Sequence, residues 1–335
     1  RMLQNHFPKI DLHLHLDGSF RLQTLWELAE QRHISMPTQT PEDFDLWIRR
    51  HAEARSVNEY LKMFAYPLAV MQDEESLTRI TKELVADLQQ QGLSYAEIRF
   101  APQLHTRLGL TQEEVLLAVL KGLHAPHSIP VGIITCMMSI GDAASNYDAN
   151  METVELCNRY IGKGVVAIDL AGAEGIVPLS AFNPLFTKAR AYHLPMTCHA
   201  GDSQHADTVR DAIGFGVTRI GHGHHIIEDE TLCHYAKEHH ITLEICPTSN
   251  VQCMTVSSYE KHPVRELFKK GVPVTINTDN MTLAHTTLKE EYEHCRKEMH
   301  FNDEELRQMC LYAIDAAFAP KEIKEQLRQQ MKGDL

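Results

Sequence analysis

Short apolar runs alternate with amphipathic segments along most of this chain. From residue 73 onward, brief stretches rich in Val, Ile and Leu are separated by segments whose apolar side chains recur at helical spacing. The first pattern is typical of strands buried on both faces, and the second of helices that cover a sheet. The predicted strands span residues 10–15, 95–101, 131–137, 165–170, 195–199, 218–222, 242–246 and 272–278.

Eight strands separated by helices predict an α/β fold with a parallel sheet. The count favours closure as a (β/α)8 TIM barrel over an open, doubly wound sheet. Helix starts are marked by capping boxes at Ser56 and Thr111, and a helical tail over about 287–335 is expected to pack outside the barrel. We therefore expect residues 1–335 to form a single barrel domain.

A helical insertion follows the first predicted strand, at about residues 37–72. It is longer than a strand-to-helix connection requires, and long ordered loops in barrels often cover active sites. Its apolar face is equally compatible with ordinary core packing. At this point both interpretations, a substrate-covering lid and a piece of core, remain open.

Composition and charge narrow the classes of function. Hydrophobic residues make up 43% of the 335 positions and charged residues 23%, which is ordinary for a globular protein. The formal net charge of −13 argues against a nucleic-acid partner, because a phosphate backbone requires a basic face. No apolar run is long enough to span a membrane, and no secretion signal is recognisable. Eight scattered cysteines without a dense framework favour free thiols and a cytoplasmic location.

The first predicted strand carries a His-x-His pair, His13 and His15, between leucines. Residues two apart in a strand lie on one face, so Asp11, His13 and His15 share a side and Leu14 faces the other way. Neutral imidazole is a common zinc ligand, but two histidines alone are as often incidental.

Further candidates stand at the ends of later strands. Barrel enzymes place their chemistry at the carboxyl ends of the strands, where this chain has His199, His222 and Asp279 in addition to the His-x-His pair. Imidazoles with one carboxylate suit zinc better than magnesium, which prefers an all-oxygen shell. The predicted strand at residues 165–170 has no lysine that could bridge two ions, so we expect one ion, whose bound water would ionise near pH 7.

Several motifs together resemble those of the adenosine deaminases. They are His13-Leu14-His15-Leu16-Asp17-Gly18, Asp169-Leu170-Ala171-Gly172, His199-Ala200-Gly201, Arg219-Ile220-Gly221-His222-Gly223, Cys246-Pro247-Thr248-Ser249-Asn250 and Asn277-Thr278-Asp279. Their order spans nearly the whole chain and is similar to that of the adenosine and adenine deaminase branch of the amidohydrolases. The resemblance implies a zinc hydroxide that attacks purine C6 and releases ammonia, converting adenosine or deoxyadenosine to inosine or deoxyinosine.

The resemblance also implies residue roles. The zinc ligands would be His13, His15, His199 and Asp279, with His222 orienting the metal-bound water and stabilising the oxyanion. On the substrate side, Gly172 resembles the backbone contact to purine N3 and Asp17 the contact to a ribose hydroxyl. Leu61 and Phe64 resemble part of an apolar lid over the purine.

Two residues depart from the family pattern. Asp202 stands where a glutamate usually protonates purine N1, and its side chain is one methylene shorter, about 1.5 Å less reach. Because general acid catalysis depends first on distance, this step is either served by Asp202, impaired, or directed to another substrate. Asn280 stands where many relatives have aspartate, and its amide can donate to purine N7 at any pH.

Three alternatives stay open. The enzyme could prefer adenine, an N6-modified base or a modified nucleoside; Asp17 favours a nucleoside. A non-catalytic purine-binding relative is the rival from another class. Whether this chain forms a homo-oligomer is also left open. Among the neighbouring residues we expect His224 and His225 to be structural, whereas Ser249 and Asn250 either end a strand or hold a loop near His222.

Overall fold

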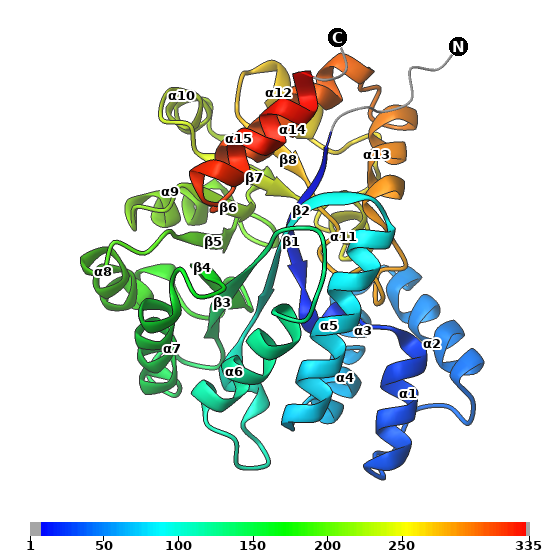
Figure 1. Ribbon diagram of the computed structural model, residues 1–335. Coiled ribbons are helices and arrows are strands. Elements are labelled where there is room, and N and C mark those ends of the chain that lie inside the picture. The colour runs from blue at the N-terminus through cyan, green and yellow to red at the C-terminus, as the bar shows by residue number, and fades with distance from the viewer. Residues whose placement is uncertain (1–7, 333–335) are drawn as a thin grey trace.

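Eight parallel strands form two four-stranded sheets in the computed structural model, which describes residues 8–332 (Figure 1). The predicted domain limits at residues 1 and 335 lie outside the described range. In each sheet the strands lie side by side in sequence order. The first sheet contains β1 (Lys9–His15), β2 (Leu93–Phe100), β3 (Val131–Ser139) and β4 (Val165–Gly172). The second contains β5 (Thr197–Ala200), β6 (Arg219–His222), β7 (Thr242–Ile245) and β8 (Val274–Ile276).

Backbone hydrogen bonds join the two sheets along both edges. On one side the His15 amide donates to the Asp279 carbonyl at 2.8 Å, and the Asp279 amide donates to the His13 carbonyl at 2.9 Å. On the other side the Ile168 amide donates to the Pro195 carbonyl at 3.0 Å, beside a bridge between Ile168 and Met196. The strands therefore close into the predicted (β/α)8 barrel, with the ends of β1 and β8 in contact.

Helices surround the strands at the predicted positions. Thr111 forms the full capping box with Glu114, whereas at Ser56 only the hydroxyl half is present, because the carboxylate of Glu59 accepts from Lys62 instead. One helix, over residues 247–252, was not predicted. The helices are α1 (Leu22–Gln31), α2 (Pro41–Glu53), α3 (Val57–Lys62), α4 (Ala65–Val70), α5 (Glu74–Gln90), α6 (Gln112–Leu123), α7 (Tyr147–Tyr160), α8 (Asn183–Ala191), α9 (Ala206–Gly214), α10 (Glu230–Glu238), α11 (Pro247–Gln252), α12 (Val264–Lys269), α13 (Leu288–Lys297), α14 (Asp303–Ala316) and α15 (Lys321–Lys332).

The insertion after β1 contributes both core and a contact to the strand ends. Its helices α2 to α4 bury Phe44 and Ile48 completely within the main apolar cluster. Tyr60 on α3 is also buried, and its hydroxyl lies 3.0 Å from the amide nitrogen of Asn280, just after Asp279. Core packing therefore accounts for one face of the insertion, and another face reaches the carboxyl ends of the strands.

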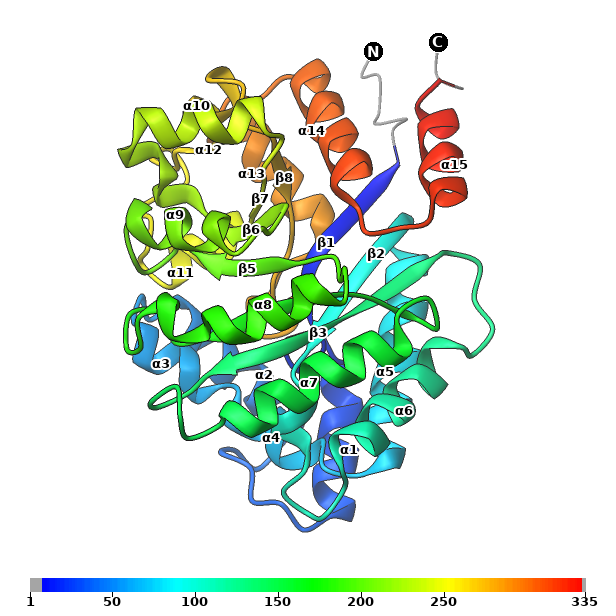
Figure 2. The ribbon, with the colours of Figure 1, turned by 90° about the vertical axis from the view of Figure 1, so that its left-hand side faces the viewer.

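The helical tail lies outside the strands, as predicted. Figure 2 shows α14 and α15 beside the beginning of β1, at the end of the barrel opposite α1 and α4. There Ile10 and Leu12 of β1 pack with Ile314 of α14 and Leu327 of α15. This packing seals the amino-terminal end of the barrel and leaves the carboxyl ends of the strands for a site.

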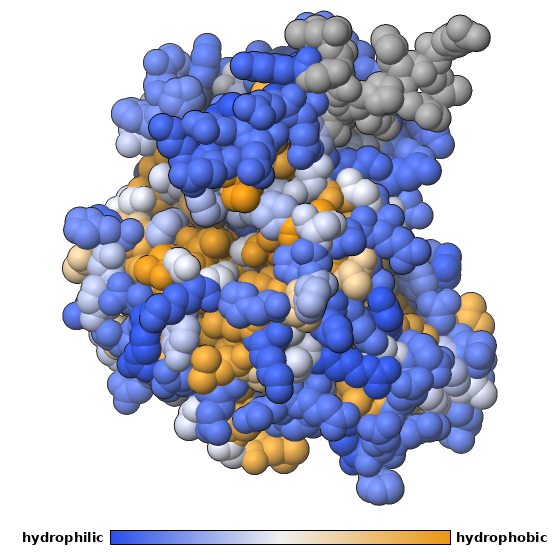
Figure 3. Space-filling view, in the orientation of Figure 1, coloured by the Kyte–Doolittle hydropathy of each residue, from blue (hydrophilic) through white to orange (hydrophobic). Residues whose placement is uncertain are grey.

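The surface is mostly hydrophilic in the orientation of Figure 3, with apolar side chains gathered between α15 and α6. No helix between residues 8 and 332 is long and apolar enough to cross a membrane.

Candidate functional site

The closure of the barrel brings Asp279 against both histidines of β1. One carboxylate oxygen of Asp279, Oδ1, lies 3.1 Å from His13 Nε2 and 3.2 Å from His15 Nε2. The contact to His13 lacks hydrogen-bond alignment, so this buried nitrogen has no hydrogen-bond partner. A buried imidazole nitrogen without a hydrogen-bond partner that faces a carboxylate and further imidazoles has the arrangement of a metal ligand.

His199, at the end of β5, completes the group of three imidazoles. Its ring centre lies 4.8 Å from that of His13 and 5.5 Å from that of His15. One nitrogen from each of these three histidines lies within 4.8 Å of the other two. The predicted ligands are spread in sequence between positions 13 and 279 and still converge in one volume, as expected for strand ends of a closed barrel.

Two buried carboxylates hold the far sides of the histidine rings. Glu244 Oε1 accepts from His13 Nδ1 at 2.8 Å, and Asp169 Oδ2 lies 3.0 Å from His199 Nδ1. A carboxylate on Nδ1 leaves Nε2 as the ligand atom and makes the imidazole more basic toward a metal. Burial, with the charge of Arg99 nearby, lowers the pKa of His13 to about 4, so the ring is in the neutral, metal-binding form at neutral pH.

Arginines neutralise these carboxylates inside the barrel. Arg99 donates to Asp169 at 3.0 Å and to Glu244 at 2.9 Å, and Arg219 donates to the other oxygen of Glu244 at 2.7 Å. Burial alone would raise the pKa of Glu244, but Arg99, Arg219 and the bond from His13 hold it well below its usual value. The charges beneath the site are therefore fixed and paired.

His222 and Asp279 both have left-handed backbone conformations, with φ of +66° and +65°. Non-glycine residues in this region carry strain that the surrounding structure must hold, and such residues concentrate at functional sites. The strain is offset locally, since Ser249 Oγ donates to Asp279 Oδ2 at 2.7 Å. His222 Nε2 lies 3.8 Å from that same oxygen, so its ring faces the histidine group.

Asp202 lies beside His222 despite its shorter side chain. Its Oδ2 is 3.8 Å from His222 Nε2, while Oδ1 accepts from His224 Nε2 at 2.9 Å and from Asn250 Nδ2 at 3.0 Å. Burial raises the pKa of Asp202, but His222 and the hydrogen bond from His224 outweigh it and hold the pKa below its usual value. His224 is thus a partner of the predicted acid, rather than only part of the scaffold.

A second carboxyl group, Glu174, stands next to Asp202. Its Oε1 accepts the Asp202 amide at 3.2 Å, and its Oε2 is buried without a hydrogen-bond partner. Burial and the charge of Asp202 raise the pKa of Glu174. Two adjacent carboxyls with pKa values displaced in opposite directions can divide the tasks of holding and transferring a proton.

Backbone geometry explains the glycine at the end of β4. Gly172 has φ of +105°, and a Cβ there would lie 2.5 Å from the Ser139 carbonyl oxygen. Only glycine fits this position without displacing β3, and the exposed backbone remains open to a ligand.

The other predicted substrate residues differ in how exposed they are. Asp17, in the short 3-10 turn after β1, is partly exposed. Asn280 is buried against Tyr60, Leu61 is 56% exposed, and Phe64 is partly buried with its ring centre 6.0 Å from that of Tyr60.

Several residues that support the site were given no role from the sequence, the arginines beneath it and four others among them. These four are Asp169, Glu174, Glu244 and His262. The first and third could have been suspected, because Ile168-Asp169-Leu170 and Leu243-Glu244-Ile245 place an acid inside an apolar strand. Glu174 and His262 lie in loops, where the sequence has no comparable periodicity.

Comparison with known proteins gives consistent matches over the whole chain. Residues 8–333 match the family described as adenosine deaminase. The adenosine deaminase of Haemophilus ducreyi is 40% identical over 325 residues, covering 95% of this chain and 94% of that protein. The crystal structure of the Arabidopsis N6-mAMP deaminase has a TM-score of 0.85 and 28% identity, covering 98% of both chains. An adenine deaminase from Arthrobacter aurescens has a TM-score of 0.87 and 24% identity, covering 97% and 98%, a likeness that concerns the fold.

Proposed function

The chain belongs to the adenosine deaminase family, and on that premise we propose that it deaminates adenosine and deoxyadenosine hydrolytically to inosine, deoxyinosine and ammonia. It is a hydrolase of the class that acts on carbon–nitrogen bonds of cyclic amidines. The observation that carries the proposal is the convergence of His13, His15, His199 and Asp279 beside His222 and Asp202.

We propose that these first four residues hold one Zn²⁺. Three neutral imidazoles and a carboxylate fit zinc, and the unpaired, buried Nε2 of His13 supports a metal rather than a hydrogen bond at this point. When bound, zinc supplies a water molecule that ionises near pH 7. Glu244 and Asp169 would hold His13 and His199 in the tautomer that presents Nε2.

The catalytic roles proposed for this chain's own residues follow from their positions. Asp202 protonates purine N1, and His222, which faces both Asp202 and Asp279 at 3.8 Å, orients the nucleophile and stabilises the developing oxyanion. Because the pKa of Asp202 is held low, the carboxyl must gain its proton as the substrate excludes water. The neighbouring Glu174, with its raised pKa, is the nearest group suited to hold that proton beforehand.

The purine would lie between the strand ends and the insertion. Gly172 offers its backbone to N3, Asn280 its amide to N7 and Asp17 its carboxylate to a ribose hydroxyl. The contact between Tyr60 and Asn280 supports a lid role for residues 37–72, with Leu61 and Phe64 over the ring. The exposure of Leu61 is consistent with an apolar side chain that becomes covered when substrate binds.

Other 6-aminopurines are the alternative substrates. Adenine and N6-mAMP are named for the two structurally similar enzymes, and Asp17 is the residue that favours a nucleoside here. A non-catalytic purine-binding protein is the rival outside enzymes, and the complete ligand set with its buried supporting carboxylates argues against it.

We further propose that residues 1–335 act as one hydrolase domain in the cytoplasm, with a homo-oligomer as an open possibility. The eight cysteines are free, and seven of them are buried, which supports a reducing compartment.

The deciding experiment measures ammonia release from adenosine, deoxyadenosine, adenine and N6-methyl-AMP by the zinc-loaded protein. We expect adenosine and deoxyadenosine to give the highest kcat/KM. The Asp202→Asn variant should lose about 10²- to 10⁴-fold in kcat, because it cannot donate a carboxyl proton. Faster turnover of adenine than of adenosine would refute the nucleoside assignment, and no turnover of any purine would favour the binding protein.

The Asp202→Glu variant tests whether the shorter acid is adapted to its surroundings. Its carboxyl would extend about 1.5 Å further, which separates it from His224 and Asn250. We therefore expect lower adenosine turnover than in the wild type, and higher turnover would identify Asp202 as a compromised acid.

A further inference from the structure

Asn250 connects the two proposed catalytic side chains to a buried histidine. It lies on α11, directly after Ser249, and its side chain is completely buried. Its Nδ2 is 3.0 Å from His222 Nδ1 and 3.0 Å from Asp202 Oδ1, and its Oδ1 is 2.9 Å from His262 Nε2. One amide thus contacts the acid, the oxyanion stabiliser and a third group that the mechanism does not use.

The donor and acceptor of each of these hydrogen bonds can be assigned in turn, starting from a backbone N–H, which can only donate. The backbone N–H of Val264 donates to His262 Nδ1 at 3.1 Å, so that nitrogen is the acceptor. Burial and the adjacent His224 lower the pKa of His262 well below its usual value, which leaves the ring neutral with its proton on Nε2. His262 Nε2–H must therefore donate, and Asn250 Oδ1 accepts.

This bond fixes which end of the Asn250 amide faces the site. With Oδ1 held by His262, Nδ2 supplies both of its hydrogens, one to Asp202 Oδ1 and one to His222 Nδ1. The reversed amide would place its oxygen against the Asp202 carboxylate, so two acceptors would face each other. Its NH₂ group would then face the Nε2–H of His262, so two donors would face each other there. His222 Nδ1 is consequently an acceptor, and its proton resides on Nε2.

We propose that Asn250, oriented by His262, is a positioning residue that keeps His222 in the Nε2–H tautomer and aims Asp202 at the same volume. His222 then acts as a hydrogen-bond donor toward the reacting oxygen, because the nitrogen that faces Asp202 and Asp279 already carries a proton. A base that removes a proton from water would need that nitrogen free. The inference rests on the proposed function for its kinetic consequence, but not for the tautomer itself.

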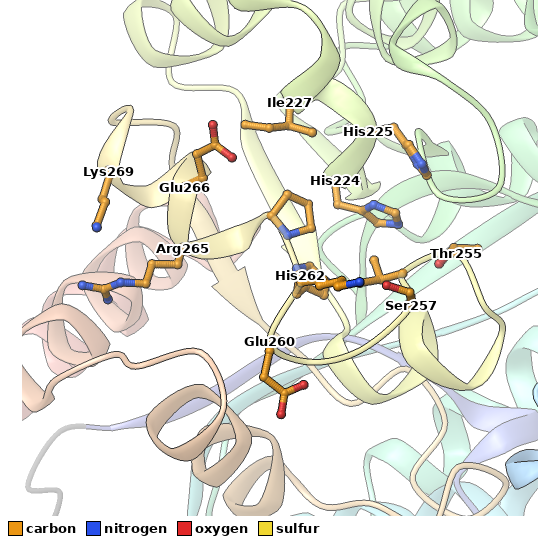
Figure 4. A pocket seen from close by; sticks show the side chains of 13 residues that line it. His224, His225, Ile227, Thr255, Ser257, Glu260, His262, Arg265, Glu266 and Lys269 are labelled. Carbon is orange, nitrogen blue, oxygen red and sulfur yellow. The ribbon is translucent and has the colours of Figure 1, made fainter.

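The histidines behind the amide also form a wall between the site and the surface. His224 and His262 line a surface pocket of about 680 Å³ together with His225, Thr255 and Arg265. Figure 4 shows His224 and His262 next to each other in this pocket, and their ring centres are 5.6 Å apart. A change at His262 therefore acts on the catalytic residues from behind, through its bond to Asn250 and its contact with His224.

The first test reads the tautomer directly. Zinc-loaded protein labelled with ¹⁵N in the histidine rings is examined by long-range ¹H–¹⁵N correlation, with the His222→Gln variant to assign the His222 signals. We expect Nδ1 of His222 at the unprotonated shift and Nε2 at the protonated shift in the wild type. A protonated Nδ1 with an unprotonated Nε2 would overturn the proposal.

The second test compares His262→Gln with His262→Leu. A glutamine can accept from Val264 N–H and donate to Asn250, so it should keep kcat within about threefold and preserve the His222 tautomer. A leucine cannot donate, so the Asn250 amide is no longer oriented, and kcat should fall about 10- to 100-fold with little change in KM. Equal kcat for the leucine variant and the wild type would refute the positioning role.

Gln112→Leu is the matched control for loss of buried hydrogen bonds. Gln112 is buried between α6 and α7, where its amide bonds Thr153 Oγ and the Ala149 carbonyl in the outer helical layer. The Gln112→Leu variant should lower Tm as His262→Leu does but leave kcat unchanged. A parallel loss of kcat in both variants would mean that destabilisation explains the effect. Absence of purine turnover in the wild type would refute the proposed function, whereas the ¹⁵N tautomer would still decide this inference.

Discussion

Replacing Glu244 by glutamine is the sharpest test of how the barrel interior supports the proposed metal ligands. The substitution keeps the size of the side chain and removes its charge. Glu244 accepts four hydrogen bonds, two on each oxygen. Oε1 accepts from His13 and Arg99 at 2.8 and 2.9 Å, and Oε2 accepts from Arg219 and Thr197 at 2.7 and 2.9 Å.

The magnitude follows from the donors that lose their acceptor. The glutamine NH₂ must replace one of the two oxygens, so two donors then face a donor. Hydrogen bonds to charged groups contribute about 1.5–3 kcal/mol each, which gives about 3–6 kcal/mol. Breaking one partner of a buried ion pair typically costs about 3–5 kcal/mol, in agreement. For 335 residues the unfolding entropy is about 0.7 kcal/mol per degree, so a loss of about 4 kcal/mol lowers Tm by about 6 °C.

The assay is thermal unfolding of metal-free and zinc-loaded protein, with zinc affinity measured by competition with a chelator. We expect the decrease in Tm in both forms and a loss of zinc affinity of about 10- to 100-fold, since His13 loses the carboxylate that orients it. The control is Glu230→Gln, which removes a partner of Lys270 at the surface and should leave Tm unchanged.

An unchanged Tm and zinc affinity in Glu244→Gln would refute this reasoning, because the buried arginines would then be satisfied without the glutamate. A lower Tm with unchanged zinc affinity would refute only the claim that Glu244 orients His13.

Three further predictions follow from single contacts. Asp279→Ala should abolish zinc binding, measured as metal content after gel filtration, and a variant that retains one zinc per chain would contradict the proposed ligand set. Gly18→Ala should lower kcat/KM for adenosine at least tenfold, since its Cβ would lie 2.0 Å from Asn280 Oδ1 and must displace that side chain; normal kinetics would exclude Asn280 from substrate binding. Burial raises the pKa of Glu291 to about 8, so its contribution to stability is present below about pH 4.5 and is lost as pH rises to about 8. Glu291→Gln should therefore gain stability relative to the wild type between pH 5 and pH 8 in thermal unfolding, and a constant difference in Tm would contradict the raised pKa.

The alternation of apolar runs and amphipathic segments was sufficient to predict the barrel. Most strands are short, buried on both faces and rich in apolar residues, although several also carry buried polar side chains such as Arg99 and Glu244. Each helix covers the sheet with one apolar stripe. The insertion was located but its role was left open, because an apolar helical face has the same spacing whether it packs as core or covers a ligand. Tyr60 illustrates this, since only the folded chain places it against Asn280.

The short helix α11 was missed because it has only six residues, begins at Pro247 and has no side-chain cap at Cys246. A segment of this length has little helical propensity of its own. Its stability depends on neighbours that are distant in sequence, such as Glu291, which accepts the Thr248 amide at 3.2 Å.

The sequence by itself determined the fold class and the candidate metal ligands, since strand ends of a closed barrel must meet and His13, His15, His199 and Asp279 all stand there. Only the tertiary structure decided which groups stand behind them. Asp169, Glu244 and the chain from His262 through Asn250 to His222 depend on side-chain direction and on hydrogen-bond polarity, and neither property follows from spacing along the chain.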